Sequence, residues 1–265
     1  MKNKIVVIPD AHARVGDDLS RFRALGKYIV KERPTDIISI GDFADMQSLS
    51  SFDSDLRKAR ITGDYQEEVS AVKTALDTLF SPLRKLQKNQ RKNKKKVYNP
   101  NTVITLGNHE ARYDRVIEQN PIILNGTISV DDLEYEKYFK TVVPFKELHF
   151  TAGVGFIHYL PNLMGRAIGG SINPARGILN HAKTSVIVGH SHLYDYAVAT
   201  TANKQRIHGV VTGAFLGTGD AHLHHTYAKG SSDNWIDGIT VLHNAENGDF
   251  DLEFLSTERL MEDYG

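Results

Sequence analysis

Five short apolar runs divide the first 190 residues of the chain, and each is followed by Asp, Asn or His. The runs cover residues 5–8, 37–40, 103–106, 154–157 and 186–188. The first consists only of Ile and Val, which is typical of a strand buried on both faces, as in a parallel sheet. The pattern therefore predicts an α/β fold in which polar side chains stand where buried strands end.

The first two runs enclose a helix. Apolar residues follow three-and-four spacing over residues 19–30, Asp17 or Asp18 can cap the helix, and Pro34 lies just beyond its end. Strand, helix and strand within about 40 residues form a βαβ unit whose right-handed crossover makes the strands parallel. Their carboxyl ends then share one edge, where open α/β sheets bind ligands.

Further elements continue the pattern without a Pro, Ser or Gly linker that would divide the chain. We expect one domain, 1–265, with an insertion at about 43–100 that contains a long helix and a basic run. The long helix begins near Tyr65 and is bent or stopped near Pro82. The other expected elements are helices at 111–119, 131–139 and 174–183, a strand at 206–212, and strands at 236–243 and 249–255 joined through Asn247-Gly248.

Composition excludes several classes of protein. Lys plus Arg and Asp plus Glu each total 32, so no net charge draws the chain to nucleic acid or anionic lipid. With no cysteine there is no disulfide and no thiolate ligand, so a metal must bind to His, Asp, Glu or Asn. The apolar run at the N-terminus is too short for a signal peptide and no stretch is long enough to span a membrane, so we expect a soluble, cytoplasmic protein.

The polar residues at the strand ends are of metal-ligating types. One such histidine alone is more often hydrogen-bonded in a core or on a surface. Several carboxylates and imidazoles brought to one edge repel and desolvate one another unless a cation compensates. Mixed N and O ligands suit Mn²⁺, Fe²⁺, Zn²⁺ or Co²⁺. The residues are Asp10, His12, Asp42, Asp45, Asn108, His109, His158, His190 and His192.

As an ordered set, these residues resemble the motifs of the calcineurin-like metallophosphoesterase superfamily, in that family's order. The resemblance covers residues 10–192 and rests on Asp10-Ala-His12, Gly41-Asp42-Phe-Ala-Asp45, Gly107-Asn108-His109-Glu110, His158 and Gly189-His190-Ser-His192.

The resemblance implies a four-layer α/β/β/α sandwich of two mixed sheets flanked by helices, with two divalent metal ions at the strand ends. Mn²⁺ is the first expectation, with Fe²⁺, Zn²⁺, Co²⁺ or Ni²⁺ as alternatives. His109 would contact phosphate and assist the leaving oxygen, with Asp45 supporting it. Asp42 would bridge the ions, one held by Asp10, His12, Asp42 and His192 and the other by Asp42, Asn108, His158 and His190.

The implied activity is hydrolysis of a phosphate ester. A phosphodiester in a nucleotide or nucleic acid is the first expectation, because residues 43–100 supply an adjustable basic wall. The alternatives are a phosphomonoesterase or protein phosphatase, and a non-catalytic metal-binding scaffold of the same fold. Two positions depart from the family pattern, which often has Arg where this chain has Met46 and Gly where it has Tyr159.

Three further features each have a functional and an ordinary interpretation. The run Arg84–Lys96 either binds nucleic acid or is a solvated helix end. His222 and His225 either contact substrate or lie in an exposed loop. Arg112 either meets phosphate or pairs with Asp114 or Glu110, while Trp235, Tyr194 and Tyr196 are expected to be packing residues.

Overall fold

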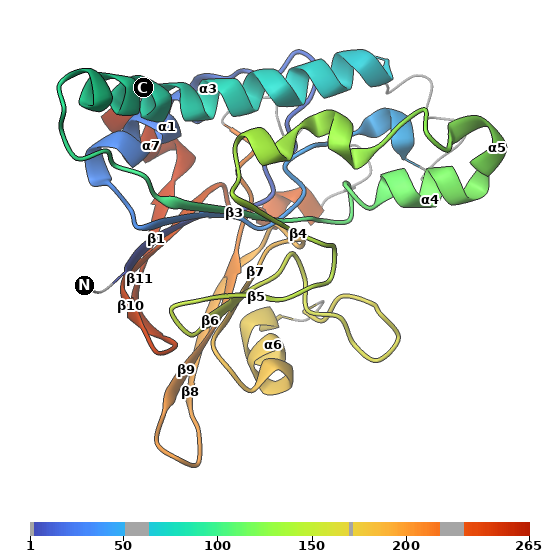
Figure 1. The fold of residues 1–265 in the computed structure, drawn as a ribbon. Coiled ribbons are helices and arrows are strands. Elements are labelled where there is room, and N and C mark those ends of the chain that lie inside the picture. The colour runs from blue at the N-terminus through green and yellow to red at the C-terminus, as the bar shows by residue number, and fades with distance from the viewer. Residues whose placement is uncertain (1–2, 51–63, 170–171, 218–230) are drawn as a thin grey trace.

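Two mixed β-sheets pack face to face in the computed structural model, which describes residues 3–50, 64–169, 172–217 and 231–265 (Figure 1). The six-stranded sheet has the order β11 (Asp249–Ser256), β10 (Gly238–Glu246), β1 (Asn3–Ile8), β2 (Asp36–Ser39), β3 (Asn101–Thr105), β4 (Thr141–Val143). The five-stranded sheet has the order β5 (His149–Thr151), β6 (Val154–Phe156), β7 (Val186–Val188), β9 (Arg206–Thr212), β8 (Tyr194–Thr200).

Parallel strands form the centre of each sheet. β1, β2, β3 and β4 are parallel to their neighbours in that series, while β10 runs antiparallel to β1. In the smaller sheet β6, β7 and β9 are parallel, and β5 and β8 are antiparallel edge strands. The parallel strands of each sheet therefore end at one edge, as the βαβ pattern predicts.

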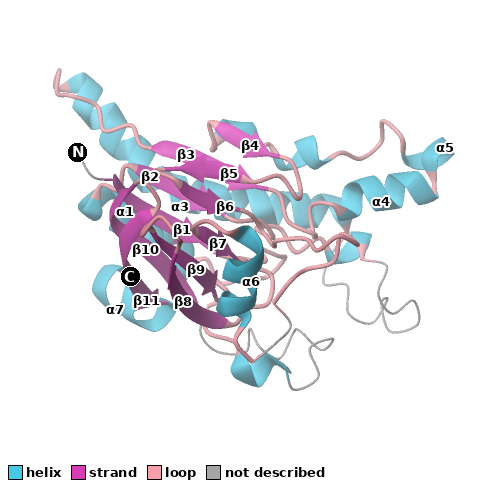
Figure 2. Cartoon of the chain, turned by 90° about the horizontal axis from the view of Figure 1, so that it is seen from below, coloured by secondary structure: helices cyan, strands magenta, loops and turns pink. Residues whose placement is uncertain are grey.

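Helices cover the outer face of each sheet. α1 (Ser20–Glu32), α3 (Tyr65–Lys92) and α7 (Thr257–Tyr264) share a hydrophobic core with the larger sheet. α6 (Pro174–Ala182) packs on β8 and β9 of the smaller sheet, as Figure 2 also shows. These layers confirm the predicted α/β/β/α sandwich. Two further α-helices of the described residues, α4 (Arg112–Gln119) and α5 (Pro121–Leu124), extend beyond the strand ends (Figure 1).

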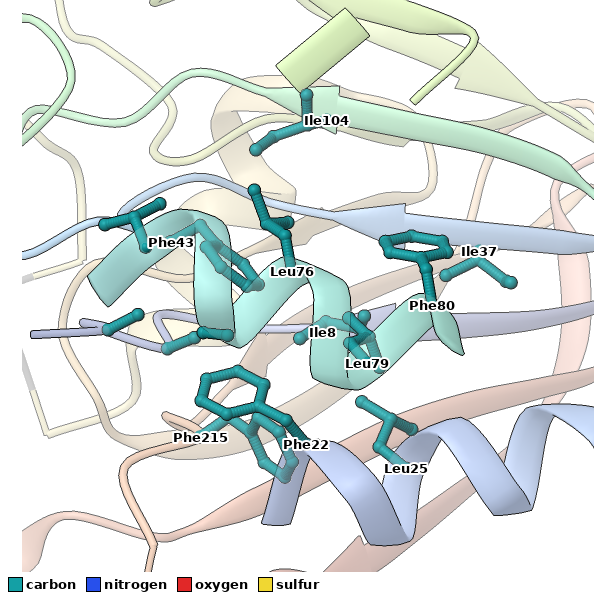
Figure 3. Close-up of a cluster of buried hydrophobic side chains, with 14 of the residues drawn as sticks. Ile8, Phe22, Leu25, Ile37, Phe43, Leu76, Leu79, Phe80, Ile104 and Phe215 are labelled. Atoms are coloured by element: carbon teal, nitrogen blue, oxygen red, sulfur yellow. The ribbon is translucent and has the colours of Figure 1, made fainter. Parts of the chain in front are cut away.

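Alternating side chains of β1 explain why its sequence contains no polar residue over 5–8. Ile5 and Val7 face the core between the two sheets, whereas Val6 and Ile8 face the helices. Figure 3 shows Ile8 beside Phe22 and Leu25 of α1 and the apolar side chains of α3. A strand with apolar layers on both faces needs a continuous apolar run rather than an alternating one.

The structure differs from the sequence predictions at several elements. The N-cap of α1 is Leu19, without a side-chain cap, because Asp18 accepts hydrogen bonds from Ser20 and Asp17 pairs with Arg21. Pro82 does not stop α3, which continues to Lys92. The segment expected as one helix at 131–139 is two 3-10 turns, η2 (Val130–Leu133) and η3 (Tyr135–Lys137), and β4, β5 and β8 were not predicted.

Within the described residues, no helix combines the length and apolarity needed to cross a membrane.

Gly26 of α1 lies directly against α3 beside Pro82. A Cβ atom added to Gly26 would lie 2.4 Å from the Leu79 carbonyl oxygen and 2.9 Å from the Pro82 ring. We expect Gly26→Ala to destabilise the protein by about 1–3 kcal/mol, because the contact with the Leu79 backbone outweighs the better helix propensity of Ala. Urea unfolding measures the change.

The matched control is Gly177→Ala in α6, where an added Cβ meets nothing within 4 Å. That variant should be neutral or more stable by up to about 1 kcal/mol. Equal effects of the two substitutions would contradict the close packing of α1 on α3.

Candidate metal centre

Loops from both sheets meet at the ends of the parallel strands. Two glycines make the approach possible, because a side chain at either would collide with a carboxylate. A Cβ on Gly107 would lie 2.1 Å from Asp42 Oδ1, and one on Gly189 would lie 2.2 Å from Asp10 Oδ1. Each glycine thus lets one loop close onto the acidic residue of another.

The first group of potential ligands is Asp10, His12 and His192, whose donor atoms lie within 4.8 Å of one another. Asp10 and His12 follow β1, and His192 follows β7. His192 Nε2 lies 3.2 Å from both Asp10 Oδ2 and His12 Nε2. All three residues are buried.

The second group is Asp42, His158 and His190, again within 4.8 Å. Asp42 Oδ2 lies 3.3 Å from His158 Nε2, and the same nitrogen lies 2.8 Å from Asn108 Oδ1. The other ring nitrogen of His158 lies 3.0 Å from the Ile40 carbonyl oxygen. That carbonyl can only accept, so it places the proton on Nδ1 and leaves Nε2 directed at the carboxylate and amide oxygens.

His109 contacts both groups. One of its ring nitrogens and potential ligand atoms of Asp42 and His12 all lie within 4.8 Å of one another. Its Nδ1 lies 2.8 Å from the Asp45 carbonyl oxygen and 3.2 Å from Asp45 Oδ1. Asp45 Oδ1 also lies 3.5 Å from His12 Nδ1. One carboxylate therefore orients both imidazoles.

Glu110 is the residue whose role the sequence analysis missed. Its Oε2 accepts the backbone N–H groups of Asp42 and Gly107, at 3.0 and 2.8 Å. Its Oε1 accepts the Ala44 N–H at 3.2 Å and the Tyr135 hydroxyl at 2.8 Å. A buried carboxylate with four donors fixes two loops at once. The available signal was its place directly after Asn108 and His109, in the same motif.

Backbone strain is concentrated at this site. His12, Asp42, His190 and His192 all have left-handed backbone conformations, with φ of 45°, 47°, 69° and 59°. Each such residue without a glycine's freedom costs about 1–3 kcal/mol, and such strain collects at functional sites. Four of the seven predicted ligands therefore hold their positions against a local backbone preference.

The pKa values reflect burial and the close pairing of acids and imidazoles. Burial and the neighbouring His109 lower the pKa of His12 to about 4, and burial beside His158 lowers that of His190 to about 4. Burial opposes protonation of His158, but the neighbouring carboxylates of Asp42 and Asp10 together outweigh it and raise the pKa of His158 to about 9. The pKa of Asp42 stays well below its usual range despite burial, because His109 and His158 lie beside it.

This donor set fits divalent cations. Neutral imidazoles and ionised carboxylates are the forms that bind a metal, and His12, His190 and Asp42 are in those forms at neutral pH, whereas His158 would release a proton when it binds a metal. The Nε2 atoms of His12 and His192 lie 3.2 Å apart, close enough to bind one cation. The described part of the chain therefore contains buried His and Asp groups that could hold metal ions.

Aromatic rings lie beside the ligands at both ends of the site. Trp235, the only tryptophan of the chain, packs edge-on against His192 with ring centroids 4.3 Å apart. Tyr159 lies 4.8 Å from His190 and also contacts Phe145. Both are partly exposed, so they form part of the rim of the site.

Other residues named from the sequence lie elsewhere. His222 and His225 fall outside the described residues. The basic run Arg84–Lys96 occupies the far end of α3, whose 28 residues span about 42 Å, and the four residues that follow it. The helix begins near the site, where Glu68 accepts hydrogen bonds from Ser48, and ends near the start of β3 (Figure 1). The run is therefore at the opposite edge of the sheet from the candidate metal centre.

Comparisons with known proteins give no close relative. No model of a protein family and no curated protein matches the sequence. Among solved structures, the chain is 11% identical to TT1561 of Thermus thermophilus, with a TM-score of 0.43 and coverage of 97% of this chain and 100% of that one. A second solved structure is 12% identical, with a TM-score of 0.38 and the same coverage. These likenesses are too distant to indicate a function.

Glu110 can be tested by Glu110→Gln. The amide retains one acceptor oxygen and turns an NH₂ group toward backbone donors, so we expect a loss of about 1–3 kcal/mol of stability and weaker Mn²⁺ binding. Urea unfolding measures the first, and Mn²⁺ quenching of Trp235 fluorescence measures the second, because that ring contacts His192.

The control is Glu118→Gln, an exposed position of α4. It should behave as the unaltered protein in both measurements. A Glu110→Gln variant with unchanged stability and unchanged Mn²⁺ affinity would contradict the role given to this carboxylate.

Proposed function

We propose that the protein is a phosphate ester hydrolase with a binuclear metal centre, of the calcineurin-like metallophosphoesterase type. The observation that supports this most is that the two groups of donors lie side by side, with His12 Nε2 of the first 4.0 Å from Asp42 Oδ2 of the second. Neither the fold nor metal binding alone implies hydrolysis, but two adjacent cation sites with a non-ligand histidine between them suit transfer of a phosphoryl group to water.

One metal would be held by Asp10, His12, Asp42 and His192, and the other by Asp42, Asn108, His158 and His190. When bound, such a pair polarises phosphoryl oxygens and makes water a stronger nucleophile at neutral pH. Mn²⁺ is the ion proposed, since the ligands are oxygen and imidazole nitrogen without sulfur.

The protein's own residues orient the substrate and exclude water. The Asp45 carbonyl and carboxylate oxygens hold His109 with its Nδ1 directed away from the site. Its Nε2 then lies 3.7 Å from Asp42 Oδ2, the carboxylate that would bridge the two ions. Because the surrounding ligands are buried, these polar contacts act in a medium of low dielectric constant, where they are stronger than in water.

The structure changes the argument about the substrate. The basic run lies at the other edge of the sheet, so it does not form a wall of this site and does not favour a nucleic acid there. A phosphodiester was the first expectation, and hydrolysis of a diester beside a monoester decides between the two substrate classes.

Hydrolysis of bis(p-nitrophenyl) phosphate and p-nitrophenyl phosphate by metal-stripped protein tests the proposal. We expect turnover only after Mn²⁺ is restored, and a loss of at least about 100-fold in Asp42→Asn, because one oxygen of the bridging ligand loses its charge. The preferred substrate identifies a diesterase or a monoesterase. Metal-bound protein without activity on either ester would support a non-catalytic scaffold instead.

His109→Ala separates metal binding from chemistry. Since His109 is not assigned as a ligand, we expect Mn²⁺ affinity within about threefold of the unaltered protein and a fall in kcat of about 10²–10⁴-fold. Trp235 fluorescence reports the affinity and ester hydrolysis reports the rate. His158→Ala, which removes a ligand, should instead lose affinity and activity together, and unchanged turnover in His109→Ala would remove its assigned role.

A further inference from the structure

Arg112, the first residue of α4, is a buried arginine without a carboxylate partner. Its exposed fraction is 8%, yet no carboxylate oxygen of the described residues lies within 4.0 Å of its guanidinium nitrogens. Neither Asp114 nor Glu110 pairs with it, although the sequence allowed both. A buried charge is normally paired, so the partner of this cation is to be sought outside the described residues.

The contacts of Arg112 hold it beside His109. Its Nη1 donates to the carbonyl oxygens of Asp45, at 2.5 Å, and Met46, at 3.1 Å. Its Nη2 lies 2.7 Å from His109 Nε2. Of the five N–H groups of a guanidinium, the Nε–H and one Nη2–H therefore have no hydrogen-bond partner in the described part of the chain.

The contact with His109 also determines which imidazole nitrogen carries the proton. Arginine can only donate, so His109 Nε2 must accept and the proton of a neutral ring is on Nδ1. That proton is donated to the Asp45 carbonyl oxygen at 2.8 Å. Asp45 thus holds one ring nitrogen and Arg112 the other.

We propose that Arg112 is the anion-binding residue of the site: its two remaining N–H groups bind a non-bridging phosphoryl oxygen, while its Nη2 fixes the tautomer of His109. That the anion is a phosphoryl group rests on the proposed function. A planar guanidinium held by two carbonyl oxygens is preorganised for a phosphoryl group in a way that a flexible ammonium is not. The substrate supplies the missing negative charge.

Inorganic phosphate is the probe, measured by ³¹P relaxation with Mn²⁺-loaded protein, which requires no turnover. We expect Arg112→Met to weaken phosphate binding by about 10- to 100-fold, as for loss of a charge-assisted hydrogen bond. Arg112→Lys should recover part of the affinity, since it restores charge but not the fork. Arg23→Met, at an exposed position of α1, is the control and should bind phosphate normally.

A second measurement detects the positioning role. In the Zn²⁺-loaded protein, ¹⁵N shifts of the His109 ring, assigned with His109→Gln, should indicate the Nδ1–H tautomer, and Arg112→Met should shift the ring toward a mixture. A purely structural residue would not change this signal. Mn²⁺ quenching of Trp235 fluorescence checks that each variant retains its metal centre. If Arg112→Met loses the centre, Arg112→Lys replaces it in both measurements. Phosphate binding weaker than that of the unaltered protein is then still expected.

The outcomes separate the two proposals. Phosphate affinity of Arg112→Met within twofold of the unaltered protein, with metal bound, would overturn the role of Arg112 while leaving ester hydrolysis intact. Where Arg112→Lys replaces Arg112→Met, a phosphate affinity within twofold of the unaltered protein would likewise overturn the role of Arg112. Unaltered protein that binds phosphate through Arg112 but hydrolyses neither ester would instead reject the proposed function.

Discussion

A reciprocal pair of hydrogen bonds between the loops after β2 and β3 supports the rest of the site. Asp42 Oδ1 accepts the His109 backbone N–H at 2.8 Å, and Glu110 accepts the Asp42 backbone N–H at 3.0 Å. Each loop thus positions the other, which holds Asp42 in its left-handed conformation. Without this pair, neither the proposed bridging carboxylate nor His109 would have a defined position.

The positions of the candidate ligands were predictable because they follow from chain topology. Each lies just after a buried run, and parallel strands end at one edge, so Asp10 and His192 were expected to share a metal despite their separation in sequence. The role of Glu110 was not predictable, since a carboxylate that binds backbone N–H groups looks in a sequence like any other acid. The partners of Arg112 were likewise open, because only the folded structure shows that no carboxylate of the described residues reaches it.

Element ends and edge strands were less predictable for related reasons. Asp17 and Asp18 are both good capping residues, but tertiary pairing of Asp17 with Arg21 decides where α1 begins. Pro82 removes one backbone donor, yet α3 continues because its apolar face packs along α1 and the larger sheet. β8 has mostly partly exposed residues and only one neighbour in its sheet, so it lacks the apolar run that identified the central strands.

The two ligand groups also connect the two sheets. Asp10 and His12 follow a strand of the larger sheet and His192 one of the smaller, while Asp42 comes from the larger and His158 and His190 from the smaller. A cation in either group would therefore hold together layers whose other contacts are mainly apolar. Because binding to the folded state stabilises it by mass action, occupancy of the centre and packing of the sandwich would be coupled, and the strain at the ligands would be offset by the same ions that they bind.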